Sequence, residues 1–309
     1  MSARTVLVLG ATGFVGRHVC AAFTAAGHRV VAVARTAVDG LAAARFTPLD
    51  LARTPAEDVA RLLEEERIDV VVNCIGSIWG APPEKMVERC TAPTLRLLEA
   101  LAVTSRRPRL VQLGSVLEQG SPPATAYGQA KLAATEAVLR ADARGEVDAL
   151  VLRVANAAGP GTPEISLLGQ VAARLKEAAG RGESALVELT ALRAHRDYVD
   201  VRDVADAVLA AAGSTATGEV VGIGRGEAVP VRSLVDDLIR ISGVPARIVE
   251  REAGPARPRT DDWIQVDVTP ARRVLGWRPR RSLEDALRSF WADSGGAAAV
   301  GHRVGGAQR

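Results

Sequence analysis

The sequence predicts an α/β protein built on a doubly wound parallel sheet, with a smaller C-terminal lobe. Two observations predict this class. Apolar segments of strand length alternate with amphipathic segments of helical length along the first half of the chain, which is the pattern of a parallel sheet covered by helices. The first apolar segment, residues 5–9, also runs directly into a glycine-rich turn and a helical segment.

Composition narrows the possible classes of protein. The chain has 309 residues, 48% of them hydrophobic, which suits one large α/β domain or a core with a smaller lobe. No apolar run approaches the roughly 18 residues of a membrane span. The N-terminus enters the first strand at once, so we expect a cytoplasmic protein without a signal peptide. The net charge is +3, and no basic run is interleaved with aromatic residues, which disfavours nucleic acid as a partner.

The three cysteines, Cys20, Cys74 and Cys90, have no metal-binding spacing. They are interpreted as small, reduced core residues, as is usual in a reducing compartment. No metal site is expected.

The glycine-rich turn is the first candidate site. Gly10, Gly13 and Gly16 recur every third residue between the strand and the helix. Such a turn lets the backbone approach a pyrophosphate, whose charge the exposed N–H groups of the helix N-terminus bind. The turn therefore predicts a dinucleotide-binding (Rossmann) core. The alternative is a plain strand–helix turn that needs glycine only for its geometry.

The end of the second strand indicates which dinucleotide binds. Residues 27–35 read as a turn and this strand, which ends in Arg35-Thr36 with no acidic residue before Asp39. At this place an acidic residue binds the ribose 2′-hydroxyl of NAD, whereas an arginine accommodates the 2′-phosphate of NADP. We therefore predict NADP(H) as cofactor. The alternative is an ordinary solvated arginine.

The following segments keep the same alternation. Asp50, at the end of the third strand, would contact the adenine or cap the next helix. The glutamates at 64–66 are expected on a solvated helix face. Ligands should bind at the carboxyl ends of the strands. The expected elements are strands at 45–51, 68–77 and 109–115 and helices at 55–66, 84–103 and 127–143.

A serine, a tyrosine and a lysine form the second candidate site. Ser115 ends the fifth strand, and Tyr127 and Lys131 lie four residues apart on one helical face. A neighbouring ammonium favours the phenolate and lowers the pKa of a tyrosine, which brings the phenol into range for proton transfer. The serine hydroxyl can hydrogen-bond a substrate carbonyl beside a nicotinamide that exchanges hydride. Taken singly, each residue has an ordinary structural explanation.

These motifs give the chain a family resemblance. It resembles the extended short-chain dehydrogenase/reductases, the branch of nucleotide-sugar epimerases, dehydratases and reductases. The matching stretches are Gly10-x-x-Gly13-x-x-Gly16, Asp50-Leu51, Asn73 to Gly76, Ser115, Tyr127-x-x-x-Lys131, Arg196 to Asp206 and Leu275-Gly-Trp277.

The resemblance implies roles for particular residues. Ser115, Tyr127 and Lys131 would be catalytic, and the lysine would also hold the nicotinamide ribose. The cofactor contacts implied by the resemblance and by the strand ends are Gly10, Thr12, Gly13, Phe14, Val15, Gly16, Arg35, Asp50, Leu51, Cys74, Ile75, Gly76, Tyr127 and Lys131.

Within the family, the serine region separates activities. The dehydratases have Thr-Asp-Glu at this strand end, whereas this chain has Ser115-Val116-Leu117 and no acid/base pair. Residues 156–169, with 73–76 and 79–80, resemble the NDP-4-keto-6-deoxyhexose 4-ketoreductases, which serve antibiotic and other natural-product biosynthesis. Two departures are Gln119, where the family often has tyrosine, and a short interval between Ser115 and Tyr127.

The second half is expected to bind substrate. A sixth strand at 149–156 ends in Asn156. By resemblance, Arg196 and one of Arg257 and Arg259 would hold the substrate diphosphate, the alternative being solvated turns. His195 is interpreted as a loop residue. The predicted substrate contacts are Ser115, Asn156, Arg196, Arg257 and Arg259. The core is predicted to span residues 1–156 and 196–224, and the lobe residues 157–195 and 225–292. Helices are expected at 166–179 and 282–291. Residues 293–309 are expected to form a disordered tail.

The predicted function is NADPH-dependent reduction of the 4-keto group of a nucleotide-linked, dTDP-type 4-keto-6-deoxyhexose. The first alternative is a nucleotide-sugar epimerase that retains NAD. A non-catalytic redox-sensing module is disfavoured, because Tyr127 and Lys131 are both present. By resemblance, a homodimer would form through residues 84–103 and 127–143. The sugar, the base and the stereochemistry of the new hydroxyl depend on the shape of the lobe and are left open.

Overall fold

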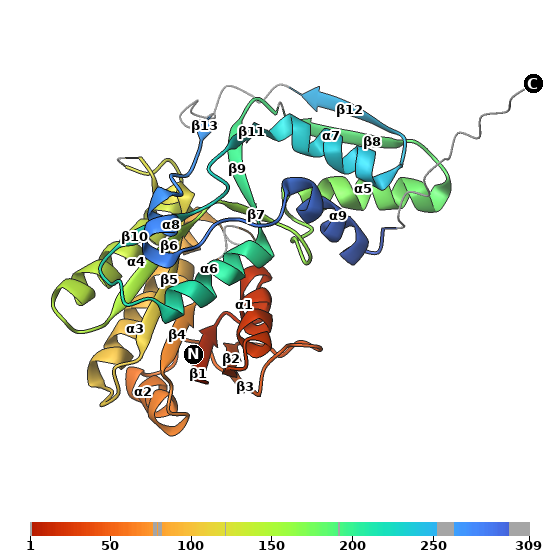
Figure 1. The fold of residues 1–309 in the computed structure, drawn as a ribbon. Coiled ribbons are helices and arrows are strands. Elements are labelled where there is room, and N and C mark those ends of the chain that lie inside the picture. The colour runs from red at the N-terminus through yellow and green to blue at the C-terminus, as the bar shows by residue number, and fades with distance from the viewer. Residues whose placement is uncertain are drawn as a thin grey trace, which may run out of the picture.

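A parallel sheet forms the centre of the molecule. The computed structural model describes residues 2–76, 79, 82–120, 122–190, 192–251 and 263–296. Its seven-stranded sheet has the order β3-β2-β1-β4-β5-β6-β10 and is parallel throughout (Figure 1). The strands are β1 (Thr5–Leu9), β2 (Arg29–Ala34), β3 (Arg45–Pro48), β4 (Val70–Asn73), β5 (Arg109–Ser115), β6 (Ala149–Val154) and β10 (Val220–Ile223). The strand order reverses between β1 and β4, so the predicted doubly wound fold is confirmed.

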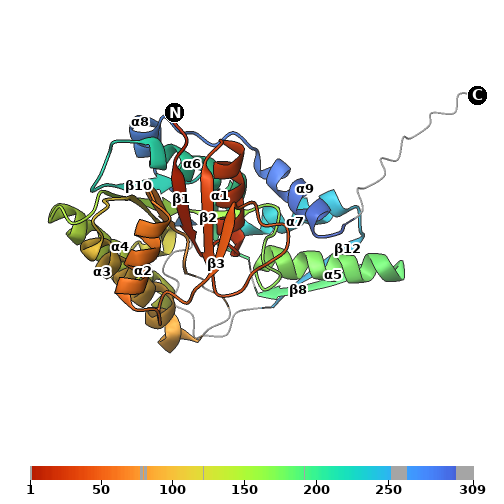
Figure 2. The ribbon, with the colours of Figure 1, turned by 90° about the horizontal axis from the view of Figure 1, so that it is seen from below.

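Helices cover both faces of this sheet, which explains why its central strands are almost continuously apolar. On one face, α1 (Phe14–Ala25) and α6 (Val201–Gly213) pack in one core cluster (Figures 1 and 2). On the other face, α2 (Ala56–Glu65), α3 (Ala92–Val103) and α4 (Ala126–Ala143) pack in a second cluster. Both faces are therefore closed, and the strand ends are left to bind ligands.

A smaller lobe stands beside one end of the sheet (Figure 1). Its core lies among three helices and a two-stranded parallel sheet. A second small sheet, centred on β9, contacts both α6 and α9 and so joins the lobe to the central domain. The elements of the lobe and of the β9 sheet are β7 (Asn156–Ala158), α5 (Leu167–Arg181), β8 (Ala185–Thr190), β9 (His195–Asp200), β11 (Ala228–Pro230), α7 (Val231–Ser242), β12 (Ala246–Arg251), β13 (Trp263–Ile264) and α9 (Leu283–Asp293). The helix α8 (Thr269–Leu275) instead packs against β10 and α6 of the central domain.

The helix expected over 84–103 is not continuous. A 3₁₀ turn, η1 (Pro83–Lys85), and a π-helical turn, η2 (Val87–Thr91), come before α3. Pro93 has no N–H to donate to the preceding turn, which favours local departure from α-helical bonding. The wider turn carries Cys90, which packs with Tyr127 in a small cluster.

Two further expectations need correction. The sixth strand ends at Val154, and Asn156 instead begins β7, which pairs with β9. Glu66 is not solvated: it is buried and bonded to the guanidinium groups of Arg29 and Arg45. These arginines start β2 and β3, so the end of α2 is fixed to the sheet by paired charges.

Candidate active site

The glycine-rich turn brings α1 close to the end of β1. Gly10 has a φ of +71°, which favours glycine. A Cβ atom on Gly16 would lie 2.1 Å from the carbonyl oxygen of Gly10. Because residue 16 is a glycine, the first turn of α1 can pack directly against the loop between β1 and α1. In this structure the glycine motif therefore permits close packing of the helix against that loop.

The N-terminus of α1 has unused hydrogen-bond donors. Its N-cap is Gly13, no side chain caps it, and its first turn contains no acidic residue. Side chains cap α4, α5 and α6, namely Thr125, Ser166 and Asp200, whereas α2, α3, α7 and α8 also lack such a cap. What distinguishes α1 is the glycine turn in front of its N-terminus. A helix N-terminus with uncapped N–H groups favours an anion such as a pyrophosphate. The turn thus fits the phosphate part of a dinucleotide.

A cavity of about 360 Å³ continues from this turn along the carboxyl ends of the strands. It contains nine of the predicted cofactor contacts. Arg35 and Arg53 also border it together, and arginine is a residue type suited to pair with phosphate. The lining residues among the predicted contacts are Gly10, Thr12, Gly13, Arg35, Asp50, Leu51, Cys74, Ile75 and Gly76.

Other predicted cofactor contacts lie outside that lining. Phe14 stacks edge-on against His18, Val15 packs against the core, and Gly16 is buried beneath the turn. Tyr127 and Lys131 lie further along the strand ends.

The predicted catalytic residues lie together at the end of β5. Ser115 is one of the groups that act on the Tyr127 phenol, and its Oγ accepts the N–H of Leu117 at 3.2 Å. Lys131 is buried, and its ammonium donates to the carbonyl oxygens of Leu113 and Ile75, the second at 3.4 Å. These carbonyls belong to β5 and to the segment after β4, so the lysine joins the two strand ends.

A second close glycine contact sets the approach of α4. A Cβ atom on Gly128 would lie 2.0 Å from the carbonyl oxygen of Leu117. Leu117 belongs to the 3₁₀ turn η3 (Val116–Glu118) that follows β5. The glycine directly after Tyr127 therefore lets α4 pack against the turn that begins at Ser115.

The pKa of Tyr127 depends mainly on its burial. Burial raises its pKa well above the ordinary value, Cys90 and Glu118 raise it further, and the hydrogen bond with Ser115 opposes them. The donors of Lys131 are directed at main-chain carbonyls, and the expectation that its charge lowers the pKa of Tyr127 stays a prediction. Tyr127 is a protonated phenol at neutral pH and is suited to donate a proton.

Burial also lowers the pKa of Lys131, while the nearby Glu118 opposes this change. Burial raises the pKa of the Cys74 thiol. A protonated thiol is a poor nucleophile, so Cys74 is not a candidate for nucleophilic chemistry at this site.

The predicted substrate contacts are less concentrated. Asn156 donates to the carbonyl of Asp197 at 3.2 Å and ties β7 to β9. Arg196 lies on β9, with one donor on the carbonyl of His195 at 3.0 Å. His195 stacks on Trp263 with ring centroids 4.8 Å apart, so it belongs to a strand and not to a loop. Arg257 and Arg259 lie outside the described residues, as do residues 297–309 of the predicted tail.

Three residues near the site were missed from the sequence. Arg53 borders the cavity from the loop after Asp50. Glu118 and Arg153 form a buried ion pair behind Ser115, with 3.2 Å between Nη2 and Oε2. A sequence signal existed for Glu118, because Ser115-x-x-Glu118 is a capping-box pattern. Arg153 had none, since only the sheet places β6 beside β5.

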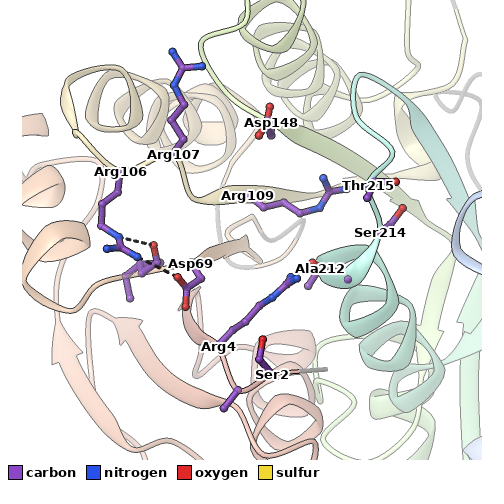
Figure 3. Close-up of a pocket in the computed structure, with 13 residues that line it drawn as sticks. Ser2, Arg4, Asp69, Arg106, Arg107, Arg109, Asp148, Ala212, Ser214 and Thr215 are labelled. Atoms are coloured by element: carbon purple, nitrogen blue, oxygen red, sulfur yellow. Dashed lines mark hydrogen bonds and ion pairs between the residues drawn. The ribbon is translucent and has the colours of Figure 1, made fainter.

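A larger cavity, of about 690 Å³, lies at the opposite, amino end of the sheet (Figure 3). Its arginines are already bonded to the protein. Arg4 and Arg109 donate to the carbonyls of Ala212 and Ala211 at 2.6 and 2.9 Å, and Arg106 pairs with Asp69 at 3.1 Å. Cations at the C-terminus of α6 are a stabilising arrangement. The catalytic residues do not line this cavity.

The strand order, the uncapped glycine turn and the serine–tyrosine–lysine cluster together define a dinucleotide-binding enzyme fold. Residues 6–224 match the NAD dependent epimerase/dehydratase family. The chain belongs to this family, which confirms the resemblance seen in the sequence. Within the described residues, no helix is both long and apolar enough to cross a bilayer.

Individual relatives are enzymes of nucleotide sugars. The chain is 43% identical over 299 residues to the dTDP-6-deoxy-L-talose 4-dehydrogenase (NAD(P)(+)) of Kitasatospora kifunensis, covering 93% of this chain and 94% of that protein. It is 25% identical to the GDP-6-deoxy-D-mannose reductase of Pseudomonas aeruginosa, covering 93% and 96%. The fold is similar to that of UDP-glucose 4-epimerase from Thermotoga maritima, solved with UDP-glucose, with a TM-score of 0.81, 23% identity and coverage of 94% and 98%.

Proposed function

We propose that this protein is an NADPH-dependent reductase of the 4-keto group of a dTDP-linked 4-keto-6-deoxyhexose. The observation that carries the proposal is the Ser115–Tyr127 pair at the end of β5, in a chain 43% identical to a dTDP-6-deoxy-L-talose 4-dehydrogenase. A 4-dehydrogenase run in reverse is a 4-ketoreductase, since oxidation and reduction at C4 share one transition state. The absence of a carboxyl pair at Val116 and Leu117 disfavours dehydration.

The proposed chemistry assigns each residue a task. NADPH bound along the strand ends would supply hydride to the ketone carbon. Ser115 would hold the ketone oxygen by a hydrogen bond, and Tyr127 would give its phenolic proton to the same oxygen as negative charge develops there. The raised pKa of Tyr127 keeps the phenol protonated before the reaction, and the cofactor and substrate would have to bring it into range for proton transfer. Lys131 would fix the strand ends through Leu113 and Ile75 and keep a positive charge in a buried site.

The proposed preference for NADPH rests on Arg35 and Arg53. Both border the cavity next to Asp50. Two guanidinium groups would pair with a 2′-phosphate, whereas nothing acidic follows Arg35 closely enough to take the 2′-hydroxyl of NAD. The uncapped N-terminus of α1 would hold the pyrophosphate.

The lobe, residues 157–195 and 225–292, is proposed to bind the nucleotide sugar, with Arg196 on its diphosphate.

A homodimer through the region of η2, α3 and α4 is proposed as well. Its support is that Val87, Leu95 and Val103 are 62%, 44% and 62% exposed although they are apolar. Light scattering would measure the mass. We also place this enzyme in the cytoplasm, because Cys20 and Cys74 are not joined by a disulfide in the described part of the chain.

The test is a pair of assays run in opposite directions. Loss of reduced-nicotinamide absorbance is followed with dTDP-4-keto-6-deoxyglucose and with the 4-keto form of dTDP-6-deoxy-L-talose, using NADPH and NADH in parallel. Formation of reduced nicotinamide is followed with dTDP-6-deoxy-L-talose. We expect turnover in both directions with one sugar series, faster with NADPH. The absence of turnover with every sugar would contradict the proposal.

An epimerase is the second candidate, because UDP-glucose 4-epimerases are among the relatives of this chain, at 27% identity for that of Azospirillum brasilense. NAD retained through purification, together with interconversion of a nucleotide sugar without added cofactor, would favour it.

A further inference from the structure

We propose that Glu118 is a positioning residue of this active site: its buried carboxylate, held by Arg153 and Thr135, fixes the Ser115 turn in the orientation that faces Tyr127. The inference deepens the proposed reductase function and rests on it for the kinetic part of the test. It concerns a residue three positions after Ser115 that contacts neither of the predicted ligands.

The carboxylate of Glu118 uses both of its oxygens. Oε1 accepts the N–H of Ser115 at 2.7 Å. Oε2 accepts the hydroxyl of Thr135 at 3.1 Å and lies 3.2 Å from Nη2 and 3.3 Å from Nε of Arg153. One fully buried side chain, with 0% exposure, therefore joins the end of β5 to α4 and β6.

The turn at Ser115 is closed from both sides. The Ser115 hydroxyl accepts the N–H of Leu117, and Glu118 accepts the N–H of Ser115, which together form a capping box. A Cβ atom on Gly114 would lie 2.7 Å from Oε1 of Glu118. Glycine at 114 thus leaves space for the carboxylate under the strand end, and the serine hydroxyl is held where Tyr127 meets it.

Glu118 also contributes charge to the site. The titratable groups that interact with it are Arg153 from β6 and Tyr127 and Lys131 from α4. Cys90 from η2 acts on the same tyrosine and lysine. The negative charge of Glu118 raises the pKa of Tyr127 and that of Lys131. Removal of this charge should therefore allow Tyr127 to ionise at lower pH.

The test begins with Glu118→Gln, which keeps the shape of the side chain. We expect kcat to fall by about 10- to 100-fold, the size of loss caused by misplacing a reacting group, with little change in KM for NADPH. The alkaline limb of the kcat profile should move to lower pH. The matched control is Glu136→Gln, an exposed carboxylate on α4 that pairs with Arg140; it should leave both readouts unchanged. A wild-type kcat and pH profile in Glu118→Gln would overturn the proposal.

The double variant Glu118→Gln/Arg153→Gln separates positioning from folding. It removes the guanidinium that the single variant leaves buried without its partner, so the melting temperature should recover. If the proposal holds, kcat and the alkaline limb stay altered. Recovery of all three would mean that the pair only stabilises the fold, and the proposal would be wrong.

A substrate-free readout separates this inference from the proposed function. The chain has two tyrosines, Tyr127 and Tyr198, so in a Tyr198→Phe background ultraviolet difference spectroscopy follows Tyr127 alone. Over the pH range in which circular dichroism shows a folded chain, phenolate should form at lower pH with Glu118→Gln than without it. Superimposable curves would overturn the electrostatic role. A shift without turnover on any sugar would leave Glu118 in place and refute only the proposed substrate.

Discussion

Cavities lie at both ends of the strands of the central sheet, here called the carboxyl edge and the amino edge, and they differ in volume and in the residues that border them. The carboxyl edge has the smaller one, about 360 Å³, bordered by the glycine turn and by Asp50 and Cys74. The amino edge has the larger one, about 690 Å³, bordered by Arg4, Arg109 and Asp148 (Figure 3). Size and charge alone would favour the amino edge as a binding site, whereas the chemistry lies beside the carboxyl edge.

The difference is in what the polar groups already bind. At the amino edge, arginines complete the C-terminus of α6, whose last carbonyls have no partner within the helix. At the carboxyl edge, the first N–H groups of α1 have no side-chain cap, and a hydroxyl pair stands at the end of β5. Donors that the fold leaves unused are a better guide to a site than the volume of a cavity.

The largest effect on activity is expected from removing a single oxygen atom, the Tyr127 hydroxyl, at the carboxyl edge. Tyr127→Phe removes the proton donor and keeps the ring, so we expect kcat to fall by about 10²- to 10⁴-fold, the range for losing a general acid. Binding of NADPH, measured by fluorescence titration, should be retained. A kcat near that of the wild type would show that another group supplies the proton.

An effect of intermediate size is expected from two arginines that border the cavity at the carboxyl edge. Arg35→Ala and Arg53→Ala should each reduce the ratio of kcat/KM for NADPH to that for NADH by about 10- to 100-fold, the energy of charge-assisted hydrogen bonds to a phosphate. The control is Arg61→Ala, an exposed arginine on α2 that pairs with Asp58. An unchanged ratio in both variants would remove the argument for NADPH.

The smallest effect on activity is expected at the amino edge. Arg109→Met removes donors to the carbonyls of Ala211 and Ala216, so the free energy of unfolding should fall by about 1–2 kcal/mol. Its kcat should stay essentially unchanged. Arg107→Met is the matched control. The Arg107 guanidinium makes a long, exposed hydrogen bond of 3.3 Å to the Gly145 carbonyl, so its loss should change the free energy of unfolding little. Loss of turnover with intact stability would show that the amino edge takes part in function.

Much of the central fold was predictable from the sequence, because its signals are local. The strand before Gly10 and the helix after it follow from period and glycine spacing, as does the helix that contains Tyr127 and Lys131. The π-helical turn at Val87–Thr91 was not predictable, since the N–H that Pro93 lacks shows in the sequence that the helix is disturbed but not which hydrogen-bond pattern replaces it. The burial of Glu66 was missed because its partners Arg29 and Arg45 come from other elements.

The sequence by itself determined the parallel sheet, the glycine turn of the dinucleotide cleft and the residues of the serine–tyrosine–lysine cluster, because each depends on a short spacing along the chain. Only the tertiary structure decided the electrostatics of that cluster. It directs Lys131 at the carbonyls of Leu113 and Ile75, and it places Glu118 and Arg153 behind Ser115. The physical reason is that pKa values depend on burial and on charges a few ångströms away, which are brought together by strands that lie far apart in sequence.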